Sequence, residues 1–99
     1  MSFIDPVHIL PHDADAEAVT LGSMILDRAA LATGASMLAA DDFFRPAHRL
    51  VFAALLGLDA AGAPVDLVTL HAALDGAGKL EAVGGDDYLV ALVEGVPDA

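Results

Sequence analysis

Apolar residues recur along most of the chain at the spacing of about three to four residues that is typical of amphipathic helices. The first such stretch follows Asp13, a good helix-capping residue, and carries Leu21 and Ile25 on one face as far as about Asp27. A second, short helix is predicted over residues 28–33, ending near Gly34. The pattern therefore opens with two consecutive helices.

Two further helices are predicted in the middle of the chain. Pro46 suits the first turn of a third helix, because its missing N–H has no partner there in any case. This helix is expected to end near Gly62. Asp66 is placed to cap a fourth helix, which ends between Gly76 and Gly78.

The last predicted helix follows a tight turn at Gly84 and Gly85. Asp86 and Asp87 favour its start, and Pro97 stops it. Residues 1–10 show no helical period, so we expect an extended arm there and a helical domain over 11–99. The fold class predicted is all-α, a small compact domain of about five helices. The predicted core is formed by Leu21, Ile25, Phe52, Leu55, Leu70, Leu74, Leu89 and Leu92.

Gly22 lies inside the first predicted helix, where glycine costs about 1 kcal/mol relative to alanine. A glycine retained at such a position indicates that another helix crosses close by.

Composition narrows the class of protein. The 99 residues are 57% hydrophobic, which excludes a disordered tail, and no apolar run reaches the roughly 18 residues of a membrane span. Cysteine is absent, so disulfides and thiolate metal sites are excluded. No signal peptide is recognisable, and we expect a cytoplasmic protein.

The net charge of the chain indicates which kinds of partner it can bind. Fifteen acidic residues against four basic ones give a net charge of −11. Direct binding of nucleic acid by this chain is not expected, because such binding depends on Lys and Arg that neutralise phosphates. The acidity fits either a basic protein partner or a requirement for solubility.

Residues suited to catalysis do not converge in the sequence. The chain has neither a Gly-x-x-x-x-Gly-Lys-Ser/Thr phosphate loop nor a Gly-x-Ser-x-Gly nucleophile motif. Pro11 between His8 and His12 argues against a metal-binding pair on one helical face. His48 lies on an apolar stripe and is predicted to be a hydrogen-bonded packing residue. We therefore predict no catalytic, cofactor or metal site.

The paired acids at 41–42 and 86–87 each precede a predicted helix. Helix capping explains such pairs better than acid–base catalysis does.

Five short motifs follow one another between about Pro11 and Pro97. They are an Ala-Glu…Leu-Gly helix, an Asp-Phe-Phe-x-x-x-His segment, a Gly-x-Pro-Val-Asp-x-Val-Thr run, a Gly-Gly-x-x-Tyr-Leu turn and a Val-Pro ending, at residues 16–23, 42–48, 62–70, 84–89 and 96–97. In this order and spacing the chain resembles the N-terminal domain of DnaB-type hexameric replicative DNA helicases. One departure is Phe44, where the family usually has Tyr.

The resemblance implies a non-catalytic collar domain that supports the helicase ring and docks the C-terminal domain of primase, with a loader as a further partner. The family continues into a helical hairpin and an ATPase motor, which would use ATP and Mg. Neither is present here, so we expect a fragment of a longer chain, cut before the hairpin.

For the docking surface the resemblance suggests Asp15, Glu17 and Tyr88. Other interpretations stay open: Asp15 and Glu17 would also stabilise the helix dipole, and Tyr88 would also serve as a half-buried core ring. The alternative function is a stand-alone acidic interaction or regulatory module, such as a nucleic-acid decoy. The reading frame beyond residue 99 separates the two.

Overall fold

The computed structural model describes residues 13–97, and all its regular structure is helical. The arm expected over 1–10, together with His8 and His12, lies outside the described residues. The all-α prediction is confirmed for the described part. Its elements are α1 (Ala14–Leu26), α2 (Arg28–Met37), a 3₁₀ turn η2 (Ala40–Asp42), α3 (Pro46–Ala60), α4 (Leu67–Gly76), α5 (Leu80–Val83) and α6 (Gly85–Glu94). No helix among these residues is long and apolar enough to cross a membrane.

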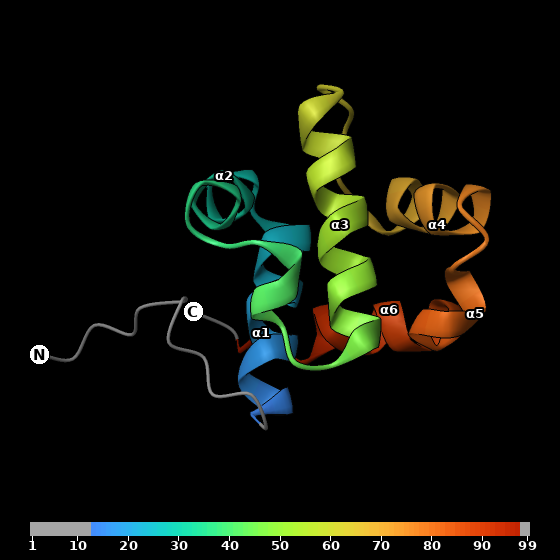
Figure 1. The fold of residues 1–99 in the computed structure, drawn as a ribbon, viewed down its shortest axis with the longest axis horizontal. Helices are drawn as coiled ribbons and strands as arrows, with labels where there is room; N and C mark the ends of the chain where they lie inside the picture. Colours follow the sequence, from blue (N-terminus) through green and yellow to red (C-terminus); the bar gives the residue numbers. More distant parts are fainter. Residues whose placement is uncertain (1–12, 98–99) are drawn as a thin grey trace, which may run out of the picture.

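Helix α3 stands at the centre of the molecule (Figure 1). It packs against α1 and α2 on one side and against α4 and α5 on the other, while α6 packs against α1, α4 and α5. Both halves of the chain therefore contribute to a single core around α3.

The predicted core is confirmed, because each of its eight side chains is at most 5% exposed. Phe43 joins it without having been predicted: this residue is 1% exposed, and its ring centroid lies 5.0 Å from that of Phe52. The residues that complete the buried cluster are Met24, Leu31, Leu38, Val51 and Val83.

Two of the predicted helix caps are present. The Asp13 carboxylate accepts a hydrogen bond from the main-chain N–H of Ala16 at 3.0 Å, and Asp66 accepts one from that of Thr69 at 2.8 Å. Each satisfies a main-chain donor that the first turn of a helix leaves without a partner.

The expected end of the second helix is wrong. Helix α2 continues through Gly34 to Met37, and Gly34 is buried. A Cβ at Gly34 would lie 2.3 Å from the Met24 side chain of α1. This glycine therefore leaves room for the end of the Met24 side chain and does not terminate the helix.

The paired acids do not cap α3 and α6 as expected, although Asp42 makes a capping hydrogen bond at η2. Asp42 accepts from the Ala39 N–H at 2.7 Å within η2, and α3 begins only after Arg45. Asp86 and Asp87 lie inside the first turn of α6, whose N-cap is a glycine without a side-chain bond. There they complement the positive end of the helix dipole.

The glycine predictions at 22 and 84–85 are confirmed. Gly84 and Gly85 both have positive φ, of 106° and 72°, and reverse the chain between α5 and α6. A Cβ at Gly22 would lie 2.1 Å from the carbonyl oxygen of Leu92, so α1 and α6 cross in close contact.

Candidate partner-binding site

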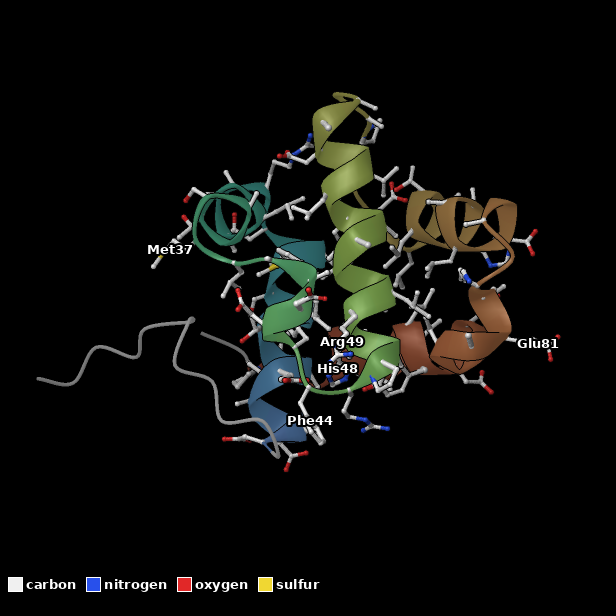
Figure 2. The ribbon with its side chains drawn as sticks, viewed as in Figure 1. Met37, Phe44, His48, Arg49 and Glu81 are labelled. Atoms are coloured by element: carbon white, nitrogen blue, oxygen red, sulfur yellow. The ribbon has the colours of Figure 1, made fainter. Side chains whose placement is uncertain are left out.

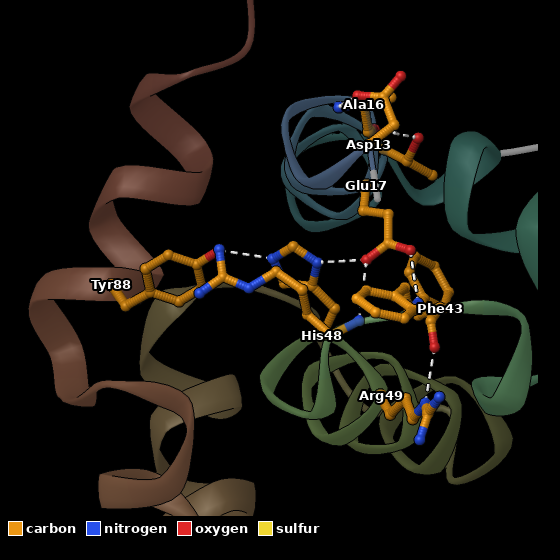
Figure 3. A network of polar contacts seen from close by, with 10 residues as sticks. Asp13, Ala16, Glu17, Phe43, His48, Arg49 and Tyr88 are labelled. Carbon is orange, nitrogen blue, oxygen red and sulfur yellow. Dashed lines mark hydrogen bonds and ion pairs between the residues drawn. The ribbon is translucent and has the colours of Figure 1, made fainter. Parts of the chain in front are cut away.

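A chain of hydrogen bonds joins α1, α3 and α6 (Figure 3). Glu17 lies on α1, His48 on α3 and Tyr88 on α6. Glu17 is 1% exposed and His48 is fully buried, whereas Tyr88 is half-buried. The chain of bonds thus runs from the interior towards the surface.

The Glu17 carboxylate is the centre of this network. It accepts a hydrogen bond from the Phe44 N–H at 2.6 Å, a longer one from the Arg45 N–H at 3.4 Å, and one from His48 Nδ1 at 2.7 Å. A buried carboxylate costs much free energy unless donors surround it, and here they do. Glu17 therefore fixes the segment between η2 and α3 against α1.

His48 carries the network on to α6. Its Nε2 lies 2.5 Å from the Tyr88 hydroxyl oxygen, and the two rings stack with centroids 5.9 Å apart. The sequence-based interpretation of His48 as a hydrogen-bonded packing residue is confirmed. Because both ring nitrogens have partners, burial of the ring leaves no polar atom unsatisfied.

The segment held by Glu17 presents an aromatic side chain to solvent. Phe44 is 54% exposed, and it lies at the end of the molecule below His48 (Figure 2). Arg49 secures the same segment from α3, donating from Nε to the Phe43 carbonyl oxygen at 2.6 Å. An exposed aromatic ring thus sits on a rigid support.

Electrostatics link Tyr88 with the acidic start of α1. Desolvation is the main cause that raises the pKa of the Tyr88 hydroxyl above its ordinary value of 10.0. Arg45 lowers this pKa, whereas Glu17 and Asp15 raise it. The hydroxyl therefore keeps its proton at neutral pH, and Asp15 is close enough to influence it.

The three residues suggested for docking have different surroundings. Asp15 is exposed and Tyr88 is half-buried, so both are accessible. The expectation of an accessible Glu17 needs correction, because this side chain is turned inwards and all its hydrogen bonds are internal. Its interpretation as a helix-dipole residue is likewise incomplete, since its partners lie on other elements.

One indication of this network is visible in the sequence. A histidine on an apolar stripe requires a polar partner, which is the argument made for His48. Its partners Glu17 and Tyr88 lie 31 and 40 residues away, so no local spacing identifies them. Among residues 13–97 no three His, Asp or Glu side chains are grouped as a metal site would require.

Comparison with known proteins identifies the relatives of this chain. Residues 9–99 match the family model described as "DnaB-like helicase N terminal domain". The replicative DNA helicase DnaB of Geobacillus stearothermophilus is 41% identical over the whole chain, and that of Mycobacterium leprae is 44% identical over 90% of it. The chain spans only 22% and 15% of the length of these relatives.

A solved structure agrees with the sequence matches. The crystal structure of the N-terminal domain of DnaB helicase from Mycobacterium tuberculosis superposes with a TM-score of 0.84 at 43% identity, covering 90% of this chain and 62% of that one. A match along nearly the whole chain, together with the same helical fold, settles the assignment. The chain belongs to the family of DnaB-like helicase N-terminal domains.

Proposed function

We propose that this chain is the non-catalytic N-terminal domain of a replicative DNA helicase, which supports assembly of the helicase ring and docks the C-terminal domain of primase. A helicase loader is a further partner in this proposal. The observation that carries the proposal is the family match over residues 9–99. The polar network supports it, because its buried groups serve to fix one end of a helical scaffold.

We place the ATPase, with its ATP and Mg, elsewhere in the full-length protein. The chain spans about a fifth of the Geobacillus relative, and it has no phosphate-binding loop of its own. In this proposal the described helices contribute contacts, and the motor contributes the chemistry.

The docking surface is proposed around Asp15 and Tyr88. Both residues are accessible, and Asp15 is among the charges that raise the pKa of the Tyr88 hydroxyl. Phe44 is exposed at the same end of the molecule (Figure 2). An exposed acid and two accessible aromatic side chains fit a partner surface that is basic and partly apolar.

Isothermal titration calorimetry with the C-terminal domain of the cognate primase tests this role. The protein is produced together with the segment that follows it in its own gene. We expect saturable binding that Asp15→Asn and Tyr88→Phe both weaken. Asp75→Asn makes the same charge change at an exposed position of α4 and serves as the control. No detectable binding at about 100 µM would contradict the docking role.

Ring assembly is tested separately by light scattering on the full gene product. We expect a defined oligomer. The net charge of −11 favours the alternative, a stand-alone acidic module that binds basic proteins. A monomer whose reading frame lacks a downstream phosphate-binding loop would support that alternative.

A further inference from the structure

The hydrogen-bond chain from Glu17 to Tyr88 has a direction. The Glu17 oxygens face the Phe44 and Arg45 N–H groups, which can only donate, so the carboxylate is the acceptor. It follows that the proton in the 2.7 Å contact belongs to His48 Nδ1. Glu17 therefore selects one of the two tautomers of the neutral imidazole.

In that tautomer His48 Nε2 carries a lone pair. The Tyr88 hydroxyl, 2.5 Å away, donates its proton to this nitrogen. An imidazolium would instead donate from Nε2 to Tyr88, so the direction of this bond depends on a neutral ring. The hydroxyl oxygen of Tyr88 then has only lone pairs left to offer to a partner.

We propose that Glu17 and His48 are positioning residues that hold the Tyr88 hydroxyl as a hydrogen-bond acceptor, so that the protein bound at Asp15 and Tyr88 presents a Lys, Arg or amide N–H donor to it. This inference rests on the proposed docking function. Two carboxylates, those of Glu17 and Asp15, act on the Tyr88 hydroxyl, and Arg45 opposes them.

The tautomer is tested on the chain alone. In a ¹⁵N-labelled variant that keeps only His48, with Gln at the other three histidines, two-bond ¹H–¹⁵N correlation at neutral pH separates the two tautomers and the imidazolium. We expect the Nδ1–H tautomer. An Nε2–H tautomer or an imidazolium at His48 would overturn the inference.

Glu17→Gln, made in the variant that keeps only His48, tests whether Glu17 sets the His48 tautomer. A merely structural role of Glu17 would leave that tautomer unchanged. The glutamine amide donates to His48 Nδ1, so we expect the ring to change to the Nε2–H tautomer. Tyr88 would then receive a hydrogen bond from His48 and offer its own proton to the partner. An unchanged tautomer in a folded variant would contradict the positioning role of Glu17.

Calorimetry with the primase C-terminal domain tests the consequence for binding. We expect Tyr88→Phe and Glu17→Gln each to weaken binding by about fivefold to tenfold, the loss typical of one hydrogen bond. Glu81→Gln removes the same charge from an exposed residue at the far side of the molecule and is expected to leave binding unchanged (Figure 2).

Two failures are distinguishable. If the unaltered protein, produced with the segment that follows it as in the docking test, does not bind primase, the docking function itself is contradicted, and the inference falls with it. If the chain binds and Tyr88→Phe binds equally well, only the inference is overturned. Tyr88→Phe decides this even if Glu17→Gln does not fold.

Discussion

Phe43 and Phe44 are neighbours in the sequence with opposite surroundings. Phe43 is 1% exposed and Phe44 is 54% exposed. The backbone is extended at Phe43, and successive side chains of an extended chain point to opposite sides. One ring therefore completes the core against Phe52, while the next is presented to solvent.

Phe52 provides the residue-scale test of the core. Its side chain is completely buried, so we expect Phe52→Ala to lower the free energy of unfolding by about 3–5 kcal/mol. Phe44→Ala removes the same atoms from an exposed position and is the matched control, with an expected loss below about 1 kcal/mol. Urea denaturation followed by circular dichroism measures both. Equal losses would show that α3 does not face the core as described.

His48 and Glu17 show how far single residues can be interpreted from the sequence. The apolar neighbours of His48 along its helix indicate burial, and burial requires hydrogen bonding, so its role was predictable. Glu17 lies in the first turn of α1, where an acid is expected on local grounds alone. Its true partners, Phe44 and His48, come from a different part of the chain, so only the folded structure brings them together.

At the scale of elements, close helix crossings depend on single glycines. Gly22 lies where α1 meets the main chain of α6, and Gly34 lies where α2 meets Met24 of α1. At Gly22 a methyl group would overlap the main chain of α6, whereas at Gly34 it would overlap the end of the Met24 side chain. Gly57 on α3, by contrast, faces open space.

This contrast predicts opposite effects of one substitution. Gly22→Ala is expected to destabilise the fold by about 1–3 kcal/mol, because a Cβ at 2.1 Å from the Leu92 oxygen must push α1 and α6 apart. Gly57→Ala is expected to stabilise it by about 0.5–1 kcal/mol through helix propensity. Chemical denaturation of the two variants in parallel is the measurement. A stabilising Gly22→Ala would contradict the close crossing.

Element boundaries were predictable where a local hydrogen bond decides them. Asp13 and Asp66 bond to main-chain groups three residues ahead, and this spacing is visible in the sequence. The acids at 41–42 and 86–87 carry the same local signal, but Asp42 bonds at η2, and Asp86 and Asp87 lie inside the first turn of α6. Helix α5 has only four residues, which is too short for the helical spacing of apolar residues to repeat and so to indicate a helix.

At the scale of the whole molecule, ion pairs connect separate helices, although the chain has only four Lys and Arg residues and a net charge of −11. Arg28 joins α2 to the end of α3, donating to Asp59 at 3.0 Å and to the Ala63 carbonyl at 2.8 Å. His71 of α4 pairs with Asp86 of α6 through a 2.6 Å contact. The two ion pairs connect residues that lie 31 and 15 positions apart in the sequence.

The His71 pair makes global stability depend on pH. The hydrogen bond to Asp86 is the main cause that raises the pKa of His71 above 6.5, and the charges of Asp86 and Asp75 add to it. Because protonation is favoured in the folded state, the stabilisation is complete below pH 6.5 and is lost as pH rises through the raised pKa. We expect the difference in unfolding free energy between the unaltered chain and His71→Gln to shrink as the pH is raised from below 6.5 to above the raised pKa of His71.

Urea titrations across this range, at low and at high salt, provide the measurement. Both side chains are partly exposed, so the effect is small and added salt should weaken it further. A stability difference that grows with pH would contradict the sign of the shift.

The sequence by itself determined the helical class, the core stripes, two helix caps and the family, because periodicity, capping chemistry and ordered motifs are properties of neighbouring residues. Only the tertiary structure decided that Glu17 is buried, that Gly34 packs within a helix and that His48 bridges Glu17 to Tyr88. These outcomes depend on which surfaces of α1, α3 and α6 meet. That meeting is set by close packing among side chains tens of residues apart, which no local pattern encodes.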